Sequence, residues 1–389
     1  MQKDSPSVPP DEAPIEHRFQ FTGAGGEYFR IWIVNLLFSI LTFGIYSAWA
    51  KVRREQYFHR NTLLDGSGFD YHGDPKAILK GRIIAVALLL ILGLIDKWAH
   101  DFYYLVVTAA SPLIPWLIIR SLIFRSRNTS FRGLHFDFHG TYKELCKAYL
   151  VPFILFIALI WAMAHAAEQS ALETVLHGAP QSATSGLLAL SVLGLFLLMP
   201  VLLYRLKVFQ FKNLAFGASR FESGFKLKSF YSIFLRATVL IPLALSLVFI
   251  ALPLVAVNLT LGHTPRSTAI ILLPFIALLY ISLLIVLPPW FTARMANLIW
   301  NNTSIDKHGF KSDLAFRGLA WINASNLLLM LLTLGLYWPW AAVRMARYRI
   351  EHTAVLAAGD LDSFIAGAAR ERSAIGEEVA DAFDFDIAF

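Results

Sequence analysis

Long apolar stretches alternate with short basic connectors along almost the whole chain. The apolar stretches cover 31–50, 83–95, 102–124, 149–167, 187–204, 237–261, 268–293 and 319–343. Most of them approach the roughly 20 residues that a helix needs to cross the hydrocarbon core of a bilayer. The pattern therefore predicts a polytopic membrane protein whose segments are helical.

The connectors between these stretches repeat one set of residues at fixed spacing. Each holds an Arg, an Asn eight residues later and a Phe eight residues after that: Arg53, Asn61, Phe69; Arg120, Asn128, Phe136; Arg205, Asn213, Phe221; and Arg294, Asn302, Phe310. An arginine at the end of an apolar helix can extend its guanidinium to the level of the lipid phosphates. We therefore interpret five arginines as lipid head-group residues, namely Arg53, Arg120, Arg205, Arg294 and Arg344.

After its Asn, a connector continues with aromatic residues at alternate positions. Phe69, Tyr71 and Gly73 illustrate the pattern, which recurs at 136–140 and, near the N-terminus, at 19–23. Alternation of aromatic with polar residues has the period of a β-strand. Each connector is therefore predicted to contain a helix end, an Asn-containing turn, a short strand and a basic return to the next apolar stretch.

The distribution of basic residues predicts the topology. The four connectors, at about 51–82, 120–148, 205–236 and 294–317, carry 7, 6, 7 and 4 Lys plus Arg, whereas the intervening turns carry only Lys97 and Arg266. Positive charge concentrates in cytoplasmic loops of membrane proteins, so the connectors are expected in the cytoplasm. No groove-reading motif accompanies the net charge of +7, so we expect membrane lipids rather than nucleic acid as partners.

The first and last apolar stretches form a second repeat. Residues 35–62 align without gaps onto 326–353, with 13 of 28 positions identical, and both contain Thr-x-Gly-x-Tyr. Each unit is either one full span, which places both termini outside, or a re-entrant segment that turns at Gly44 or Gly335. Re-entrance agrees better with the positive-inside rule.

These patterns predict an all-α polytopic membrane protein with about six transmembrane helices. The helices form three hairpins, flanked by two homologous re-entrant or short terminal segments, so that eight apolar segments are joined by repeated cytoplasmic strand-turn connectors. We expect residues 1–18 to be a disordered cytoplasmic tail, 19–350 an integral membrane domain and 351–389 an acidic cytoplasmic tail, with both termini in the cytoplasm.

Several long segments resemble the YjgN-like family of bacterial inner-membrane proteins. They include FTGAGGEYF, LTFGIYSAWAKVRREQYF, NTLLDGSGFDYHGDPKAILKGR and LTLGLYWPWAAVRMARYR. The resemblance covers about residues 18 to 387 and implies a multi-pass protein of the bacterial inner membrane. Because the family is one of unknown function, the resemblance implies no mechanism.

Polar residues within the two homologous units are candidates for a substrate pathway. Corresponding interrupted segments in two halves of a chain indicate a transport site in some transporters. The candidates are Asn35, Thr42, Gly44, Tyr46, Asn326, Thr333, Gly335 and Tyr337. The commoner role of such residues is hydrogen bonding between helices.

Metal-binding and catalytic signals are weak. Asp70 with His72 and Asp137 with His139 form two Asp-x-His pairs that could supply ligands to a divalent cation, but the other connectors lack the pair. We therefore predict no metal and no cofactor. No nucleophile elbow or phosphate-binding loop occurs in the sequence, so an enzyme is not expected.

Two functions remain open from the sequence. One is a transporter or channel-like protein for a small solute or lipid, with a path lined by the two Thr-x-Gly-x-Tyr units. The other is a non-transporting membrane protein that binds lipid or scaffolds partners through its basic cytoplasmic face.

Overall fold

The computed structural model describes residues 14–98, 106, 108–110, 113–177, 182–237 and 285–375. Its helices are α1 Gly25–Leu41, α2 Ser47–Arg60, α3 Pro75–Trp98, α5 Leu113–Arg127, α6 Tyr142–His177, α7 Ser182–Lys212, α10 Phe316–Leu332, α11 Trp338–Glu351 and α12 Leu361–Ile375. Residues 227–237 and 285–300 are also helical.

The connectors contribute strands to one antiparallel sheet. The strands are β1 Ile15–Arg18, β2 Gln20–Phe21, β3 Thr62–Leu64, β4 Ser67–Tyr71, β5 Thr129–Phe131, β6 Leu134–Phe138, β7 Leu214–Phe216, β8 Ser219–Ser223, β9 Thr303–Ile305, β10 His308–Ser312 and β11 Thr353–Ala357. Over the described residues they form an 11-stranded sheet in the order β1-β11-β10-β9-β8-β7-β6-β5-β4-β3-β2. The predicted all-α fold is therefore wrong.

The reason for this error lies in the tight turns of the connectors. Each connector holds two strands rather than one, and the strands are joined by turns such as Asp65-Gly66 and Arg132-Gly133, whose four φ angles lie between +49° and +79°. Positive φ at both central residues matches the right-handed twist of the flanking strands, so these pairs form hairpin turns. The Asp-Gly dipeptide at 65–66 is a strong sequence signal for a hairpin.

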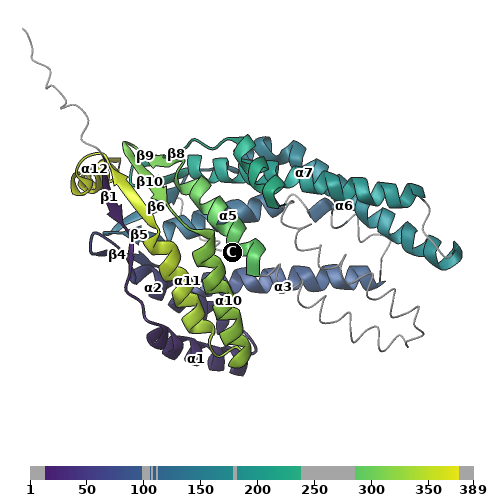
Figure 1. Cartoon of the computed structure of the whole chain (residues 1–389), viewed down its shortest axis with the longest axis horizontal. Helices are drawn as coiled ribbons and strands as arrows, with labels where there is room; N and C mark the ends of the chain where they lie inside the picture. Colours follow the sequence, from purple (N-terminus) through teal and green to yellow (C-terminus); the bar gives the residue numbers. More distant parts are fainter. Residues whose placement is uncertain are drawn as a thin grey trace, which may run out of the picture.

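The predicted number of membrane spans is also too high for the part of the chain that the structure describes. Three helical segments there are long and apolar enough to cross a membrane: Pro75–Ile95, Tyr149–Leu176 and Thr184–Lys212. The predicted stretch at 237–261 lies almost wholly outside the described residues, as does most of 268–293. In Figure 1 the long helices α3, α6 and α7 extend to one side of the sheet.

The sheet comes round on itself to form a nearly closed barrel. Strands β1 and β2 stand at opposite ends of the strand order, yet only Phe19 separates them in the chain. The Phe19 N–H donates to the Thr353 carbonyl at 3.1 Å, while β2 pairs with β3. One short stretch of chain thus bridges both ends of the sheet.

Phenylalanine rings line the inside of the barrel. Phe19, Phe69, Phe136, Phe221 and Phe310 follow one another around its interior, with successive ring centroids 6.1, 6.5, 6.4 and 5.9 Å apart. These are the recurring phenylalanines of the connectors together with their N-terminal counterpart. Offset and tilted ring pairs at such distances contribute favourably beyond their burial.

The recurring asparagines make the same two bonds in every connector. The side-chain Nδ2 of Asn61, Asn128, Asn213 or Asn302 donates to the carbonyl four residues earlier, at 2.7–3.0 Å. Its backbone carbonyl accepts an N–H from the residue that directly follows the preceding hairpin or N-terminal strand, for example from His72 to Asn128 at 2.8 Å. Each asparagine therefore ends its helix and ties that helix to the neighbouring hairpin.

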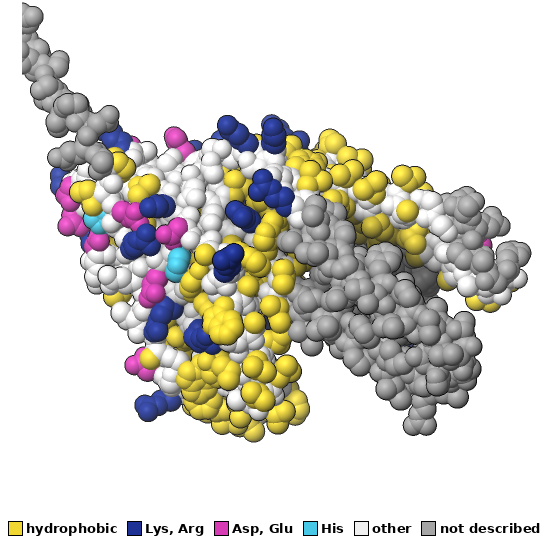
Figure 2. Space-filling model, in the orientation of Figure 1, with side chains coloured by type: hydrophobic (Ala, Val, Ile, Leu, Met, Phe, Trp, Pro, Cys, Tyr) yellow, Lys and Arg dark blue, Asp and Glu magenta, His cyan; other side chains and the backbone are white. Residues whose placement is uncertain are grey.

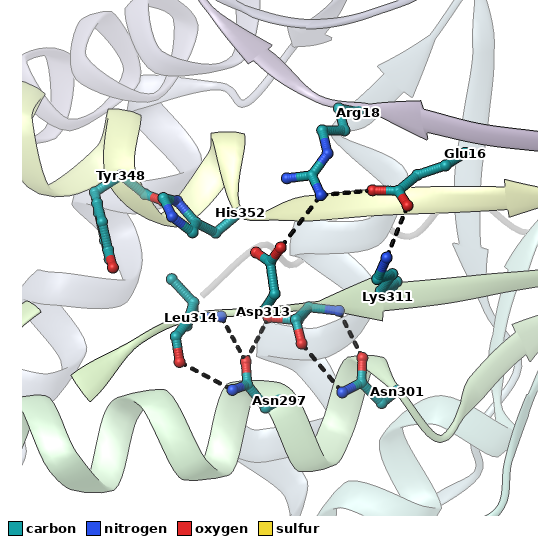
Figure 3. A network of polar contacts seen from close by, with 10 residues as sticks. Glu16, Arg18, Asn297, Asn301, Lys311, Asp313, Leu314, Tyr348 and His352 are labelled. Atoms are coloured by element: carbon teal, nitrogen blue, oxygen red, sulfur yellow. Dashed lines mark hydrogen bonds and ion pairs between the residues drawn. The ribbon is translucent and has the colours of Figure 1, made fainter. Parts of the chain in front are cut away.

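The first strand, β1, meets β10 and β11 at one seam of the barrel, part of which is shown in Figure 3. Arg18 of β1 forms ion pairs with Glu16 at 2.7 Å and Asp313 at 3.2 Å, and Lys311 of β10 reaches Glu16 at 2.7 Å. The hydrogen bond from Lys311 and the charge of Arg18 hold the pKa of Glu16 below its usual value. Asn297 pairs with both backbone groups of Leu314 at 3.0 Å.

The N- and C-terminal segments belong to the folded unit. Residues 15–18, assigned to a tail in the sequence analysis, form β1, and 353–357 form β11 between β1 and β10. Helix α12 then packs Leu361, Ile365 and Ala368 against the phenylalanine core. The acidic segment after 375 lies outside the described residues.

The Phe-x-aromatic-x-Gly motif has a steric explanation that predicts a mutational effect. A Cβ at Gly140 would lie 2.5 Å from Cε1 of Phe138 and 2.7 Å from Cζ of Phe209. We expect Gly140→Ala to lower the free energy of unfolding by about 1–3 kcal/mol, measured by thermal unfolding in detergent. Gly26→Ala is the control, because nothing lies within 4 Å of that added Cβ. Equal losses in both variants would contradict the packing argument.

The contact of α12 with the barrel is expected to depend on pH. His308 is buried, its Nδ1 has no partner in the described structure, and its ring lies 4.7 Å from that of Phe364. Burial lowers the pKa of His308 against the opposing charge of Asp306, with smaller lowering contributions from His17 and Lys307.

Because the unfolded state then binds more protons, stability should be full above about pH 6.5 and fall below it. Hydrogen exchange of α12 between about pH 5.5 and 7.5 measures this effect. His308→Phe should flatten the profile; a flat wild-type profile would contradict the prediction.

Candidate functional site

A large cavity lies between the barrel and the helix ends that feed it. It consists of two adjoining voids of about 710 and 590 Å³. Both are bounded by Phe19, Phe69 and Phe136 from the barrel and by Trp300 from the helix over 285–300. Volumes of this size are typical of small-molecule sites.

The larger void continues down the barrel to α12. Its wall includes Phe131, Phe216 and Phe221 from the strands, and its far end is closed by Leu361 and Phe364 of α12. This wall is apolar and aromatic except for His308. The part of the cavity next to α12 therefore suits a hydrocarbon group.

The opposite end of the cavity carries positive charge. Arg125 of α5, Lys207 of α7 and Arg349 of α11 line the larger void together with Gln210. Lys207 Nζ donates to Gln210 Oε1 at 3.1 Å. Among the described residues, neither void is lined by a carboxylate, and none of the three cations has an ion-pair partner there.

Two of the three rim cations, Arg125 and Arg349, occupy one position of the repeated connector. The residues five positions after the recurring arginines line the cavity in every case: Phe58, Arg125, Gln210, Ile299 and Arg349. These residues differ in type from connector to connector, so identities between the connectors do not reveal them. The shared offset is the signal that would have found them.

The arrangement combines apolar volume with unneutralised cations. A cationic rim beside an apolar aromatic wall favours a ligand with a negative head and an apolar body. The head would pair with the cations, and the apolar body would contact the aromatic wall instead of water. Guanidinium groups bind carboxylates and phosphates through paired hydrogen bonds. The lining of the cavity thus matches the two parts of an anionic amphipath.

The predicted pathway residues lie in two helical hairpins. Helix α1 turns back into α2, and α10 into α11, at Gly44 and Gly335, whose φ angles are +90° and +89°. Figure 1 shows α10 and α11 side by side, running across the direction of α3, α6 and α7. The chain therefore reverses at the predicted glycines.

Hydrogen bonds give the Thr-x-Gly-x-Tyr residues a role in these turns. The Thr42 hydroxyl donates to the Phe38 carbonyl at 2.7 Å and accepts from the Tyr46 N–H at 2.9 Å. Thr333 and Tyr337 repeat these bonds in the second hairpin. The side chains of both threonines are thus engaged within their own hairpins.

The two asparagines of the predicted pathway differ. Asn326 Oδ1 accepts from Arg344 at 2.8 Å, and its Nδ2 donates to the Ala341 carbonyl at 3.3 Å. Asn35 is equally buried, but its Oδ1 has no hydrogen-bond partner in the described structure.

The predicted head-group arginines lie in different surroundings. Arg53 and Arg120 stack on Tyr46 and Trp116 at 5.8 and 5.6 Å from the ring centroids. Arg294 is exposed, and Arg205 is half-buried. Arg344 is held by Asn326 and other side chains of its hairpin.

The weak metal candidates each have a side-chain partner in the described structure. Asp70 accepts from Arg60 at 2.9 Å, and Asp137 accepts from Arg127 at 3.4 Å. His72 contacts the Ser130 hydroxyl at 2.8 Å, while His139 lies 3.9 Å from Asp137. Within the part of the chain that the structure describes, no group of three or more potential ligands is positioned to hold a metal.

Comparison with known proteins places the chain in a family. The model of the bacterial protein family of unknown function DUF898 matches residues 16–382. The chain belongs to this family. It is 25% identical over 359 residues to a protein of Salmonella typhimurium (strain LT2) named inner membrane protein YjgN, covering 89% of this chain and 90% of that protein. The resemblance to YjgN-like proteins is thus confirmed.

Shorter matches link the chain to other members of the family. Proteins of the same name from Escherichia coli O157:H7 and Escherichia coli K12 are 27% and 28% identical over 159 residues, covering 37% of this chain and 36% of each relative. No solved structure matches the chain.

The three rim cations lack carboxylate partners, so we expect the charge of Lys207 to destabilise the ligand-free protein. Replacing Lys207 by Met removes a partly buried charge beside Arg125 while keeping the shape of the side chain, so the melting temperature should rise by about 2 °C. Added salt between about 0.05 and 0.5 M should stabilise the wild type more than Lys207→Met. Lys311→Met is the control, because it removes the ion pair with Glu16 and should not stabilise. A lower melting temperature for Lys207→Met would contradict the prediction.

Proposed function

We propose that this protein is a multi-pass protein of the bacterial inner membrane that binds an anionic lipid in the cavity between the barrel and the helices. The observation that carries the proposal is the cavity itself, with an aromatic wall closed by α12 and a rim of Arg125, Lys207 and Arg349. The acyl chain would occupy the barrel, and the anionic head would lie at the rim.

The membrane setting follows from the helices and the charges. The three candidate spans are largely exposed in the isolated chain, with 6–11% of each span's most apolar window buried. Exposed apolar surface on this scale supports a membrane setting. The basic connectors build the barrel, so by the positive-inside rule we expect the barrel in the cytoplasm. The names of the relatives agree with an inner-membrane location.

Lipid binding is favoured over transport by the roles of individual residues. The threonines of the Thr-x-Gly-x-Tyr units bond within their own turns, and Asn326 bonds to Arg344 of its own hairpin. The cations of the cavity, in contrast, have no carboxylate partner among the described residues, and of the three only Lys207 has a side-chain hydrogen bond, to Gln210. The proposal therefore rests on the cavity rather than on a path through the hairpins.

Quenching of tryptophan fluorescence tests the proposal. Trp300 lines both voids, so a brominated lysophosphatidylglycerol that enters the cavity should quench it by contact. Quenching should be saturable, and the Trp300→Phe variant should lose that part of the signal. Lysophosphatidylcholine carrying the same brominated chain should bind at least about tenfold more weakly, since it lacks the net negative charge.

Variants that remove rim charges test whether the rim binds the head group. The double variant Lys207→Gln with Arg349→Gln should weaken binding about tenfold or more, because it removes two charged donors. Arg294→Gln is the matched control: it lies on the helix that carries Met295 and Trp300, yet its side chain does not line either void. Quenching that is unchanged in both Trp300→Phe and the double variant would refute the proposal.

A further inference from the structure

A basic groove lies between the helices of the first hairpin. It has a volume of about 500 Å³ and is lined by Arg30 and Val34 of α1 and by Arg53, Tyr57 and Arg60 of α2, among others. No acidic residue lines it in the described structure. Arg60 forms an ion pair with Asp70 through Nε. Arg30 and Arg53 have no carboxylate partner among the described residues.

The second hairpin holds its equivalent arginine by hydrogen bonds that Arg53 lacks. At the offset that aligns the two units, Arg53 corresponds to Arg344, which donates to Asn326 Oδ1 at 2.8 Å and to Ser325 Oγ at 3.2 Å. In the first hairpin Val34 stands in place of Ser325, and Arg53 instead lies over the Tyr46 ring. Arg344 is therefore committed to its own hairpin, whereas Arg53 is available to a ligand.

Because Arg53 does not bond to Asn35, the side-chain oxygen of Asn35 lacks a donor. This residue corresponds to Asn326 and is 7% exposed, yet its Oδ1 has no hydrogen-bond donor in the described structure. An unsatisfied buried acceptor is unfavourable, and such groups in native proteins call for an explanation. A ligand that holds Arg53 away from Asn35 provides one.

The other cations of the groove are also specific to the first hairpin. At the same offset Arg30 corresponds to Trp321 and Arg60 to Glu351. Gln56 of the groove corresponds to Arg347, so the second hairpin has two arginines at these positions where the first has three. Both are already bonded, Arg344 to Asn326 and Arg347 to the Gly23 carbonyl at 2.8 Å. The two hairpins have the same backbone arrangement, so they differ here only in their side chains.

The surface beyond the groove is apolar. The exposed side chains of Val34, Leu37 and Leu41 follow one another along α1 towards the turn, where Phe43 is 99% exposed. Spacings of three and four residues place such side chains on one face of a helix. In Figure 2 hydrophobic side chains cover the lower end of the hairpins, whereas Lys and Arg side chains gather above it.

We propose that this groove binds the phosphate group of an acidic phospholipid, with Arg30, Arg53 and Arg60 as its ligands. The acyl chains lie along the apolar face of α1, and the turn at Phe43 enters the hydrocarbon region. The site is separate from the central cavity, and it stands whether or not that cavity binds lipid.

Native mass spectrometry tests the site by stoichiometry. The full chain, delipidated in a neutral detergent, is titrated with dioleoyl-phosphatidylglycerol. If both sites are occupied, the wild type carries two tightly bound lipids, Arg53→Gln carries one, and Lys207→Gln with Arg349→Gln carries the other one. If only the groove binds, the wild type carries one lipid, and Arg53→Gln alone removes it. A count that Arg53→Gln and Arg30→Gln both leave unchanged overturns the groove site.

Arg344→Gln is the matched control. It removes the equivalent arginine of the second hairpin, so it should lower the melting temperature while leaving the affinity for phosphatidylglycerol within about twofold of the wild type. Arg53→Gln should do the reverse: the affinity of the groove falls about tenfold, and the lipid-free melting temperature is unchanged. Equal effects of the two variants on affinity would overturn the proposal.

A variant that keeps the charge separates binding from simple attraction. Val34→Ser supplies the hydroxyl that holds Arg344 in the second hairpin. Arg53 should then turn to Asn35, so that lipid affinity falls and the melting temperature rises although the net charge is the same. Unchanged affinity in Val34→Ser, combined with a higher melting temperature, would show that Arg53 is not a ligand.

Soluble compounds distinguish the source of the phosphate. Glycerophosphoglycerol, which is the head group without acyl chains, should bind at least about a hundredfold more weakly than the lipid, because the apolar face of α1 then contributes nothing. Equal binding of glycerophosphoglycerol or inorganic phosphate would assign the groove to a soluble anion and overturn the lipid proposal.

Discussion

Pairing of both edges of the sheet is the constraint on which the barrel depends. An open sheet of short strands exposes unpaired N–H and C=O groups, which invite association with other chains. Here Phe19 and the strands beside it satisfy both edges at once, because the same stretch of chain bonds to β11 on one side and to β3 on the other. The barrel therefore needs no separate strand to close it.

Closure also positions the cavity. Each hairpin is tied to the next by an asparagine that ends one helix and accepts a bond from the residue that follows the neighbouring strand. The helices that reach the barrel consequently end at one level, and residues five positions after each recurring arginine meet around a common opening. The strands of the connectors thus supply the aromatic interior, and the helix ends of the connectors supply the cationic rim.

The sequence contains the parts of this structure more clearly than their assembly. The Asn turn, the alternating aromatics and the reversal at Gly44 and Gly335 follow from local rules, because each depends on residues within one or two turns of chain. The barrel does not follow from these rules. Sideways pairing of hairpins from separate connectors depends on contacts between residues tens to hundreds of positions apart, for which periodicity holds no signal.

The candidate sites show the same division. The basic character of the connectors is visible in the sequence, but the difference between Arg53 and Arg344 is not, since both occupy identical places in the repeat. The partners in space separate them: Ser325 and Asn326 hold Arg344 by hydrogen bonds, whereas Val34 offers Arg53 none and Arg53 lies over the Tyr46 ring. Likewise, Lys207 becomes a rim residue only because α7 ends beside the barrel.

The pairing of β1 with β11 sets the order in which the protein can be made. Ile15 lies opposite Ala357, so the first strand to leave the ribosome waits for almost the whole chain before it finds its partner. Contacts between such distant positions form late, because loop closure must precede them. Until then the hairpins between them form an open sheet with an exposed edge on each side. The barrel is consequently finished only at the end of synthesis, and a chain that stops short of residue 357 is left with an unpaired edge that proteases and chaperones can recognise.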